Sequence, residues 1–286
     1  MEDTLEIFNK NELHTRNQQS NIFHGDTREI VNFLPENFYA CCVTSPPYWG
    51  KRDYGYGGQL GAEEDLGEYI ANLVSIFRVV KRKLRSDGTL WLNIGDSYTS
   101  GNRTWRAGDK KNPAREMSYR PPTPDGLKPK DLIGVPWRLA FALQEDGWYL
   151  RSDIIWYKPN CQPESVKDRP TLSHEYVFLF SKSEKYLYNS DDVKEPAAEP
   201  GKTRNRRSVW SINTEPYNEA HFATFPKELV KPIVKAGSNL GDFILDPFFG
   251  SGTVGVVCNN LGRHYHGIEL KEEYVSLAKK RIFDGE

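Results

Sequence analysis

The feature that most constrains the fold is a glycine-rich segment, DPFFGSGTVG at residues 246–255, close to the C-terminus. It follows a short apolar stretch typical of a buried strand and opens a stretch with the pattern of a helix. Gly250, Gly252 and Gly255 have the spacing of a nucleotide-binding turn, where a backbone without side chains can bend sharply and approach a ligand. A strand, a glycine turn and a helix in this order predict an α/β fold.

The position of this turn in the chain restricts the kind of sheet. Only 36 residues follow Gly250 in the 286-residue chain, too few for the strands that a dinucleotide-binding domain needs after its turn. The other strands must come from upstream, which predicts a circularly permuted order and disfavours a nicotinamide oxidoreductase. An adenosine ligand without a phosphate tail fits better, and Glu269, at the end of the next predicted strand, is placed to accept both ribose hydroxyls. On the motif alone, a glycine-rich connection without a ligand is the alternative.

The hydrophobic pattern of the rest of the chain predicts alternating strands and helices, as expected for an α/β fold. It predicts strands at 21–24, 38–44, 89–94, 148–157, 175–180, 243–245 and 265–269. It predicts helices at 66–84, 135–145, 226–236, 253–261 and 272–282. A turn at Ser86-Asp87-Gly88 is expected to end the first of these helices. Two long stretches without a period, 98–130 and 181–216, predict loop inserts in one domain that spans 20–286.

Composition excludes several classes of protein. The net charge of −1 rules out a basic protein that coats nucleic acid, although residues 102–130 carry a local charge of +5. A second basic patch includes Arg204, Arg206 and Arg207, and solvated loops are the alternative explanation for both patches.

The mean hydropathy is −0.66, and the sequence has no long uncharged apolar run and no secretory leader at its start, so we expect a cytoplasmic protein without a membrane span. Four unevenly spaced cysteines predict reduced thiols rather than a disulfide framework or a metal site.

A second motif, TSPPYW at residues 44–49, follows the predicted strand 38–44. Consecutive prolines cannot continue a strand, so Ser45 and Pro46 present oxygen acceptors on a stiff turn with Tyr48 close by. A proline-rich strand exit with core aromatics is the alternative. Because both motifs follow strands of one parallel sheet, we expect them to meet at its carboxyl edge.

Together the two motifs resemble the permuted β group of S-adenosylmethionine-dependent DNA amino-methyltransferases, in which an SPPY-type motif precedes an FxGxG cofactor motif. The resemblance extends over nearly the whole chain, through HGD (24–26), GTLWLNIGDSY (88–98), LRSDIIWYKPN (150–160), DRPTLSHEYVFLF (168–180), RSVW (207–210) and HFATFP (221–226). It implies a Rossmann-like, seven-stranded, mostly parallel sheet with helices on both faces, loop inserts and one antiparallel strand near an edge. Strands 148–157 and 175–180 are our candidates for the paired strands at that edge.

The resemblance also implies the residues of the site. The catalytic residues would be Ser45, Pro46, Pro47 and Tyr48. The cofactor would contact Asp26, Thr224, Phe225, Asp246, Pro247, Phe248, Gly250, Gly252, Thr253 and Glu269. In such a methyltransferase the two basic stretches would form the DNA cleft, as a basic loop at 98–130 and a target-recognition insert at 181–216. From their charge, the residues expected to contact DNA are Arg103, Arg106, Lys110, Lys111, Arg204, Arg206 and Arg207.

The implied reaction needs no metal. The amino group of a base is a poor nucleophile until hydrogen bonds favour a tetrahedral nitrogen, and acceptors such as Ser45 and Pro46 can receive these bonds. The base must also be flipped out of the duplex to reach them. In this family, serine at the first motif position accompanies methylation of cytosine N4, so Ser45 favours cytosine, with adenine N6 as the alternative. A cysteine-nucleophile cytosine methyltransferase is disfavoured, because Asn160 rather than proline precedes Cys161.

The implied substrate is double-stranded DNA. A cognate restriction enzyme and a homodimer are further partners that the resemblance leaves open. An inactive nucleic-acid-binding module on the same fold is the remaining alternative, but such a module would be expected to lose Ser45 or the glycine turn, and both are present.

Overall fold

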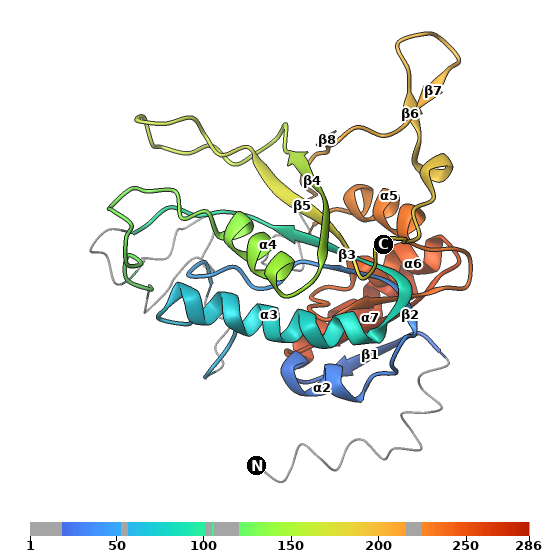
Figure 1. The fold of residues 1–286 in the computed structure, drawn as a ribbon, viewed down its shortest axis with the longest axis horizontal. Helices are drawn as coiled ribbons and strands as arrows, with labels where there is room; N and C mark the ends of the chain where they lie inside the picture. Colours follow the sequence, from blue (N-terminus) through green and yellow to red (C-terminus); the bar gives the residue numbers. More distant parts are fainter. Residues whose placement is uncertain (1–18, 53–56, 101–104, 106–119, 216–224, 286) are drawn as a thin grey trace.

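The computed structural model describes residues 19–52, 57–100, 105, 120–215 and 225–285, which form a layered α/β structure (Figure 1). The strands are β1 (Asn21–His24), β2 (Tyr39–Thr44), β3 (Leu84–Ile94), β4 (Tyr149–Tyr157), β5 (His174–Ser181), β6 (Glu195–Pro196), β7 (Thr203–Arg204), β8 (Val209–Ser211), β9 (Phe243–Asp246) and β10 (His264–Glu269). The helices are α2 (Thr27–Phe33), α3 (Leu66–Lys83), α4 (Val135–Glu145), the 3-10 helix η2 (Ser190–Val193), α5 (Lys227–Gly237), α6 (Thr253–Asn260) and α7 (Glu272–Asp284).

The main sheet has the order β1-β10-β9-β2-β3-β5-β4-β8 in the described part of the chain. β5 runs antiparallel to both of its neighbours, β3 and β4, and the other pairings are parallel. The two last strands of the chain, β9 and β10, lie between the first two, β1 and β2. This is the permuted order that the late position of the glycine turn predicts, and the mostly parallel α/β fold is confirmed.

The expected number of strands was wrong. Among the described residues the main sheet has eight strands rather than seven, because β8 adds to the outer edge of β4. The backbone N–H of Ile155 donates to Ser208 O at 2.8 Å, and that of Ile212 donates to Tyr157 O at 3.0 Å. β4 and β5 do pair with each other as expected, but β8 covers the edge of β4. The stretch 181–216 is therefore not irregular throughout, since it also holds η2 and the β6–β7 ribbon.

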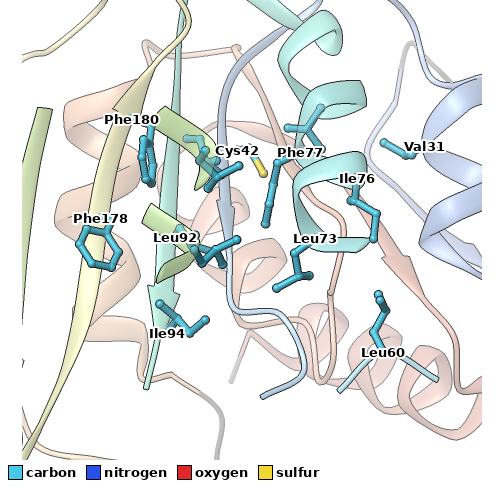
Figure 2. Close-up of a cluster of buried hydrophobic side chains, with 14 of the residues drawn as sticks. Val31, Cys42, Leu60, Leu73, Ile76, Phe77, Leu92, Ile94, Phe178 and Phe180 are labelled. Carbon is cyan, nitrogen blue, oxygen red and sulfur yellow. The ribbon is translucent and has the colours of Figure 1, made fainter. Parts of the chain in front are cut away.

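Helices cover both faces of the sheet because alternate strand residues point in opposite directions (Figure 1). Cys42 and Leu92 belong to the hydrophobic cluster under α2, α3 and α4, whereas Cys41 and Trp91 belong to the cluster under α5, α6 and α7. Figure 2 shows the first cluster, in which Phe77 of α3 lies beside Cys42 and Leu92. The fully buried strand β2 and the buried part of β3, from Gly88 to Ile94, thus form the centre of the molecule.

α3 shows how the sequence pattern becomes structure. Its buried residues recur at three- and four-residue steps, and the Asp65 side chain caps its start by accepting from Glu68 N at 2.8 Å. The helix ends at Lys83, close to the expected position, but β3 begins at the next residue rather than after a turn at Ser86–Gly88. Those residues form an irregularity within β3, where the pairing with β2 jumps from Leu84 to Thr89. Contacts with the chain after β5 hold it there, including Lys182 N to Gly88 O at 3.0 Å.

α2 was not expected from the sequence, because its seven residues are too few to show a helical period. A cap at its start was the available signal, since Asp26 precedes it and accepts from Arg28 N. Among the described residues, none of the helices is long and apolar enough to cross a membrane.

The strand directions decide which residues meet. The parallel strands β1, β2, β3, β4, β9 and β10 all end at the same edge of the sheet, and β5 begins there because it runs the other way. The segments that follow β2 and β9 hold the SPPY motif and the glycine turn. The residues after β4 and at the start of β5 join them from the other side.

Candidate active site

The glycine turn after β9 is held in a conformation that only glycine adopts easily. Gly250 and Gly252 have φ angles of 53° and 82°, and Gly252 is the N-cap of α6. The Phe249 backbone N–H donates to Ile268 O at 2.9 Å, which fastens the turn to β10. A Cβ at Gly250 would meet no atom within 4 Å, so the turn borders open space at this residue. A ligand can approach the backbone there.

The third glycine of the motif has a packing role. A Cβ at Gly255 would lie 2.6 Å from Cδ1 of Ile282, so Gly255 lets α6 approach α7 rather than a ligand. From α7, the buried Arg281 supports the turn, because its Nη1 donates to Ser251 O at 2.9 Å and to Ser251 Oγ at 2.6 Å. The sequence did not single out Arg281, which lies 30 residues beyond Ser251.

Asp246 joins the two motifs. Its Oδ1 accepts from the Thr44 hydroxyl at 2.6 Å and from Phe248 N at 3.0 Å, so one carboxyl fixes the ends of β2 and β9 together. Its Oδ2 is buried and has no hydrogen-bond partner within the described structure. Burial, followed by the charge of Glu269, raises the pKa of Asp246 to about 7 from an ordinary 3.8. An unpaired carboxyl oxygen at this position is suited to a cationic or hydrogen-bond-donating ligand.

The pH dependence of stability tests this state of Asp246. The folded protein keeps a proton on Asp246 that the unfolded chain releases above pH 3.8, so this contribution is full below that pH and is lost as the pH rises through about 7. At about 1.4 kcal/mol per pKa unit, we expect the free energy of unfolding to fall by roughly 2–3 kcal/mol more in wild type than in Asp246→Asn between pH 5 and pH 8. Urea unfolding at both pH values measures this, and equal pH dependence in the two proteins would refute it.

Glu269, at the end of β10, closes the other side of the turn. Its Oε2 accepts from Gly250 N and its Oε1 from Lys271 N, both at 2.8 Å. Burial raises the pKa of this carboxyl, although the backbone donors oppose the rise. Because each carboxylate oxygen can accept a second hydrogen bond, both remain able to receive ribose hydroxyls.

The other predicted cofactor residues lie around this turn with differing roles. Thr253 begins α6, and Pro247 accepts a hydrogen bond from the Thr27 hydroxyl. Asp26 caps α2 and forms an ion pair with Arg28, so its carboxylate already has partners, and a contact with adenine stays a prediction. Phe248 and Phe225 are partly buried and pack against the two hydrophobic clusters. Thr224 lies outside the described residues.

The SPPY segment leaves the end of β2 as an anchored turn. The Tyr69 hydroxyl of α3 donates to Pro47 O at 2.7 Å, and the indole N–H of Trp49 donates to Glu63 O at 2.9 Å. The Ser45 hydroxyl donates to the Tyr48 hydroxyl oxygen at 3.4 Å. Pro46 is buried. The second proline is therefore an anchor rather than an acceptor free for a substrate.

A polar cluster that the sequence did not predict lies beside Tyr48. The Tyr48 hydroxyl donates to Oε2 of Glu175 at 2.8 Å, and the Asn93 amide donates to the same oxygen at 3.2 Å. Lys158 Nζ lies 2.5 Å from Oε1 of Glu175 and 4.2 Å from the centre of the Trp156 ring. These side chains come from β3, β5 and the end of β4, so only the sheet order brings them together. The available signal was that they stand at strand ends on the carboxyl edge.

The comparisons with known proteins agree with this geometry. A family model for N6 and N4 methyltransferases, with the description DNA methylase, matches residues 39–280. The chain belongs to this DNA methylase family. The Type II methyltransferase M.SmaI of Serratia marcescens is 62% identical over 283 residues, which cover 98% of this chain and 97% of that protein. The Type II methyltransferase M.Cfr9I of Citrobacter freundii is 60% identical over 261 residues, covering 91% and 87% of the two chains.

Two solved structures share the fold of this DNA methylase. The PvuII DNA methyltransferase (cytosine-N4-specific) superposes with a TM-score of 0.69 at 22% identity and covers 94% of both chains. TTHA0409, a putative DNA modification methylase from Thermus thermophilus in complex with S-adenosyl-L-methionine, superposes with a TM-score of 0.64 at 25% identity. That match covers 93% of this chain and 94% of the other. The predicted family and its fold are thus confirmed.

The predicted DNA contacts of the methylase divide into two groups. Arg103, Arg106, Lys110 and Lys111 lie outside the described residues. The other three lie in β7 or directly after it and already have protein partners. Arg204 and Arg207 donate to Oε1 of Glu195 at 2.9 and 2.6 Å, and Arg206 lies 4.5 Å from the centre of the Trp210 ring. A role of these arginines in DNA binding stays a prediction.

Proposed function

We propose that this member of the DNA methylase family methylates the exocyclic N4 amino group of a cytosine flipped out of duplex DNA. The protein is a DNA methyltransferase of the Type II group by its family and its relatives. The observation that carries the finer assignment is Ser45, which stands first in its SPPY motif and is joined through Thr44 to Asp246 and the glycine turn. The similarity in fold to a cytosine-N4-specific enzyme supports it.

The methyl donor is S-adenosylmethionine. The residues around the glycine turn fit this molecule, because Asp246 Oδ2 is buried without a partner and the space at Gly250 is open. Asp246, Phe248, Gly250, Gly252 and Glu269 would hold it, with Glu269 accepting from the ribose. When bound, it supplies an electrophilic methyl group on a sulfonium sulfur.

The SPPY turn acts on the nucleophile. An amino group conjugated with its ring has little lone-pair density on nitrogen, and acceptors for its two hydrogens shift the nitrogen toward a tetrahedral form. The Ser45 hydroxyl oxygen and the Pro46 carbonyl are these acceptors, while Pro47 O accepts from Tyr69 and anchors the turn. The Tyr48 ring offers a surface on which a flipped base stacks. Placement of the nitrogen in line with the methyl group then supplies most of the acceleration.

The basic segments complete the proposal. We assign the loop 98–130, with Arg103, Arg106, Lys110 and Lys111, to contacts with DNA phosphates, and the segment 181–216, with its three arginines, to target recognition. Both assignments rest on charge and on the family resemblance. The relatives are named Type II methyltransferases, which supports a cognate restriction enzyme as a partner in the cell.

Expression in a host that lacks DNA methylation tests this function. Chromosomal DNA from cells that produce the protein is digested to nucleosides and analysed by mass spectrometry, with cells that produce Ser45→Ala as the control. We expect N4-methylcytosine with the wild-type protein and far less of it with Ser45→Ala. N6-methyladenine would keep the mechanism and overturn the choice of base, whereas unmodified DNA would overturn the proposed function.

A further inference from the structure

We propose that Glu175 is a positioning residue that acts through Tyr48 to turn the hydroxyl hydrogen of Ser45 away from the substrate, so that Ser45 meets the amino group as an acceptor only. This inference rests on the proposed function of Ser45, but it concerns Glu175 and Lys158, to which neither motif assigns a role. Its evidence is a chain of hydrogen bonds in which Ser45 donates to Tyr48 and Tyr48 donates to Glu175, while Lys158 donates to the same carboxylate.

The direction of this chain is set at Glu175. An ionised carboxylate only accepts hydrogen bonds, so the Tyr48 hydroxyl must donate its one hydrogen to Oε2 of Glu175 at 2.8 Å. Burial alone would raise the pKa of Glu175, but the charge of Lys158 and the hydrogen bonds from Lys158, Tyr48 and Asn93 keep it below its ordinary value. Glu175 therefore stays ionised and keeps its role as acceptor.

The hydrogen bond from Tyr48 to Glu175 in turn decides which of Tyr48 and Ser45 donates to the other. Because the Tyr48 hydrogen is used at Glu175, the Tyr48 oxygen presents its lone pairs to Ser45 and receives the Ser45 hydrogen at 3.4 Å. This bond is long, as hydrogen bonds in active sites often are before the substrate binds. A serine without this constraint can rotate and donate to the amino nitrogen, which would occupy the lone pair that attacks the methyl group. With the hydrogen held at Tyr48, the Ser45 oxygen has only acceptor positions left for the substrate.

The packing around the pair leaves room for this arrangement. A Cβ at Gly95 would lie 2.9 Å from Cε2 of Tyr48 and 3.1 Å from Cδ of Glu175, so the glycine after β3 lets both side chains approach the strand end. The Lys158–Glu175 ion pair is only partly exposed, and the net stabilisation from such a pair is small, because removing two charges from water offsets most of their attraction. The position of this ion pair beside Tyr48 is better explained by its effect on the Tyr48 hydroxyl, which it keeps as a donor to Glu175.

Replacement of Glu175 by glutamine should reverse the donor and acceptor roles along these hydrogen bonds. The single amide oxygen will face the cation of Lys158, and the amide N–H₂ will then face Tyr48, which must accept there and donate to Ser45 instead. We expect Glu175→Gln to lower kcat by about 10- to 100-fold, with KM for DNA and Kd for S-adenosylhomocysteine within twofold of wild type. Tyr48→Phe keeps the ring and the ion pair but removes the link, so it should cause a similar fall. The double variant should be no slower than the slower single variant.

A matched control is Glu36→Gln, which changes another glutamate paired with a lysine, Lys83, away from the active edge. It should retain the wild-type kcat. Methylation measured under saturating DNA and S-adenosylmethionine, with melting temperatures for each variant, gives the result. A wild-type kcat in Glu175→Gln would overturn the positioning role while the proposed function stands. So would a double variant whose loss of kcat is the product of the two single losses.

An inactive wild-type protein would instead overturn the proposed function. If Glu175→Gln fails to fold, Tyr48→Phe still tests the connection between Glu175 and Ser45.

Discussion

Ser45→Ala is expected to lower kcat for DNA methylation by 10²- to 10³-fold, the range seen when one hydrogen-bonding group that stabilises a transition state is removed. Alanine removes the acceptor for one amino hydrogen, while the Pro46 carbonyl and the anchor between Tyr69 and Pro47 remain. Ser45 is not one of the proposed cofactor residues, and the Thr44–Asp246 hydrogen bond that supports them is kept. The affinity for S-adenosylhomocysteine, measured by calorimetry, should therefore stay within about twofold. Single-turnover methylation of duplex DNA measures the loss.

Ser183→Ala is the matched control for this variant. Its hydroxyl donates to Ser86 O at 2.7 Å on the exposed surface, next to the irregular part of β3 and away from the active edge. It should have the wild-type kcat. A Ser45→Ala protein that turns over at more than a third of the wild-type rate, or one that no longer binds S-adenosylhomocysteine, would contradict the role assigned to Ser45.

Glu269→Gln is expected to weaken the binding of S-adenosylhomocysteine by at least 10-fold and up to about 100-fold, even though glutamine has the same shape. Both oxygens of Glu269 accept from backbone N–H groups, of Gly250 and of Lys271. The amide N–H₂ must face one of these donors, so a partly buried N–H loses its partner and the turn shifts, at a cost of about 1–3 kcal/mol. The ribose also loses one acceptor.

Calorimetric titration with S-adenosylhomocysteine measures this effect, and the binding of DNA in the absence of cofactor should not change. Glu272→Gln is the control, because Glu272 lies in the first turn of α7 near Glu269 but is exposed. It should bind S-adenosylhomocysteine as the wild type does. Unchanged affinity in Glu269→Gln would show that the carboxylate holds neither the turn nor the ribose.

Most of the fold was predictable, because its helices show strong periods and its central strands are compact apolar runs. α4 has the expected limits, Val135–Glu145, and β1 likewise, and the late glycine turn predicted the permuted order. The elements that were missed or misplaced depend on distant contacts. β8 is three residues long and exists as a strand because the edge of β4 pairs with it. The turn at Ser86–Gly88 became an irregular part of β3 because residues after β5 bind it there.

The site was predictable to the extent that it consists of local motifs. Ser45 to Tyr48 and the glycine turn each follow one strand, so their meeting at the carboxyl edge followed from the parallel order alone. Glu175 could not be placed beside Tyr48 in this way, since 127 residues separate them and only the antiparallel direction of β5 brings its start to that edge. Arg281 supports the turn from a helix whose rotation the sequence pattern does not fix.

The most direct test of the central claim follows the methyl group itself. The purified protein is incubated with unmethylated duplex DNA and S-adenosylmethionine that carries a trideuterated methyl group, and the DNA is digested to nucleosides for mass spectrometry. We predict N4-methyldeoxycytidine that carries the deuterated methyl group, formed at an initial rate about 100-fold or more above that of a parallel reaction with Ser45→Ala. Label on the N6 of adenine, on a ring carbon of cytosine, or on no nucleoside would contradict the claim.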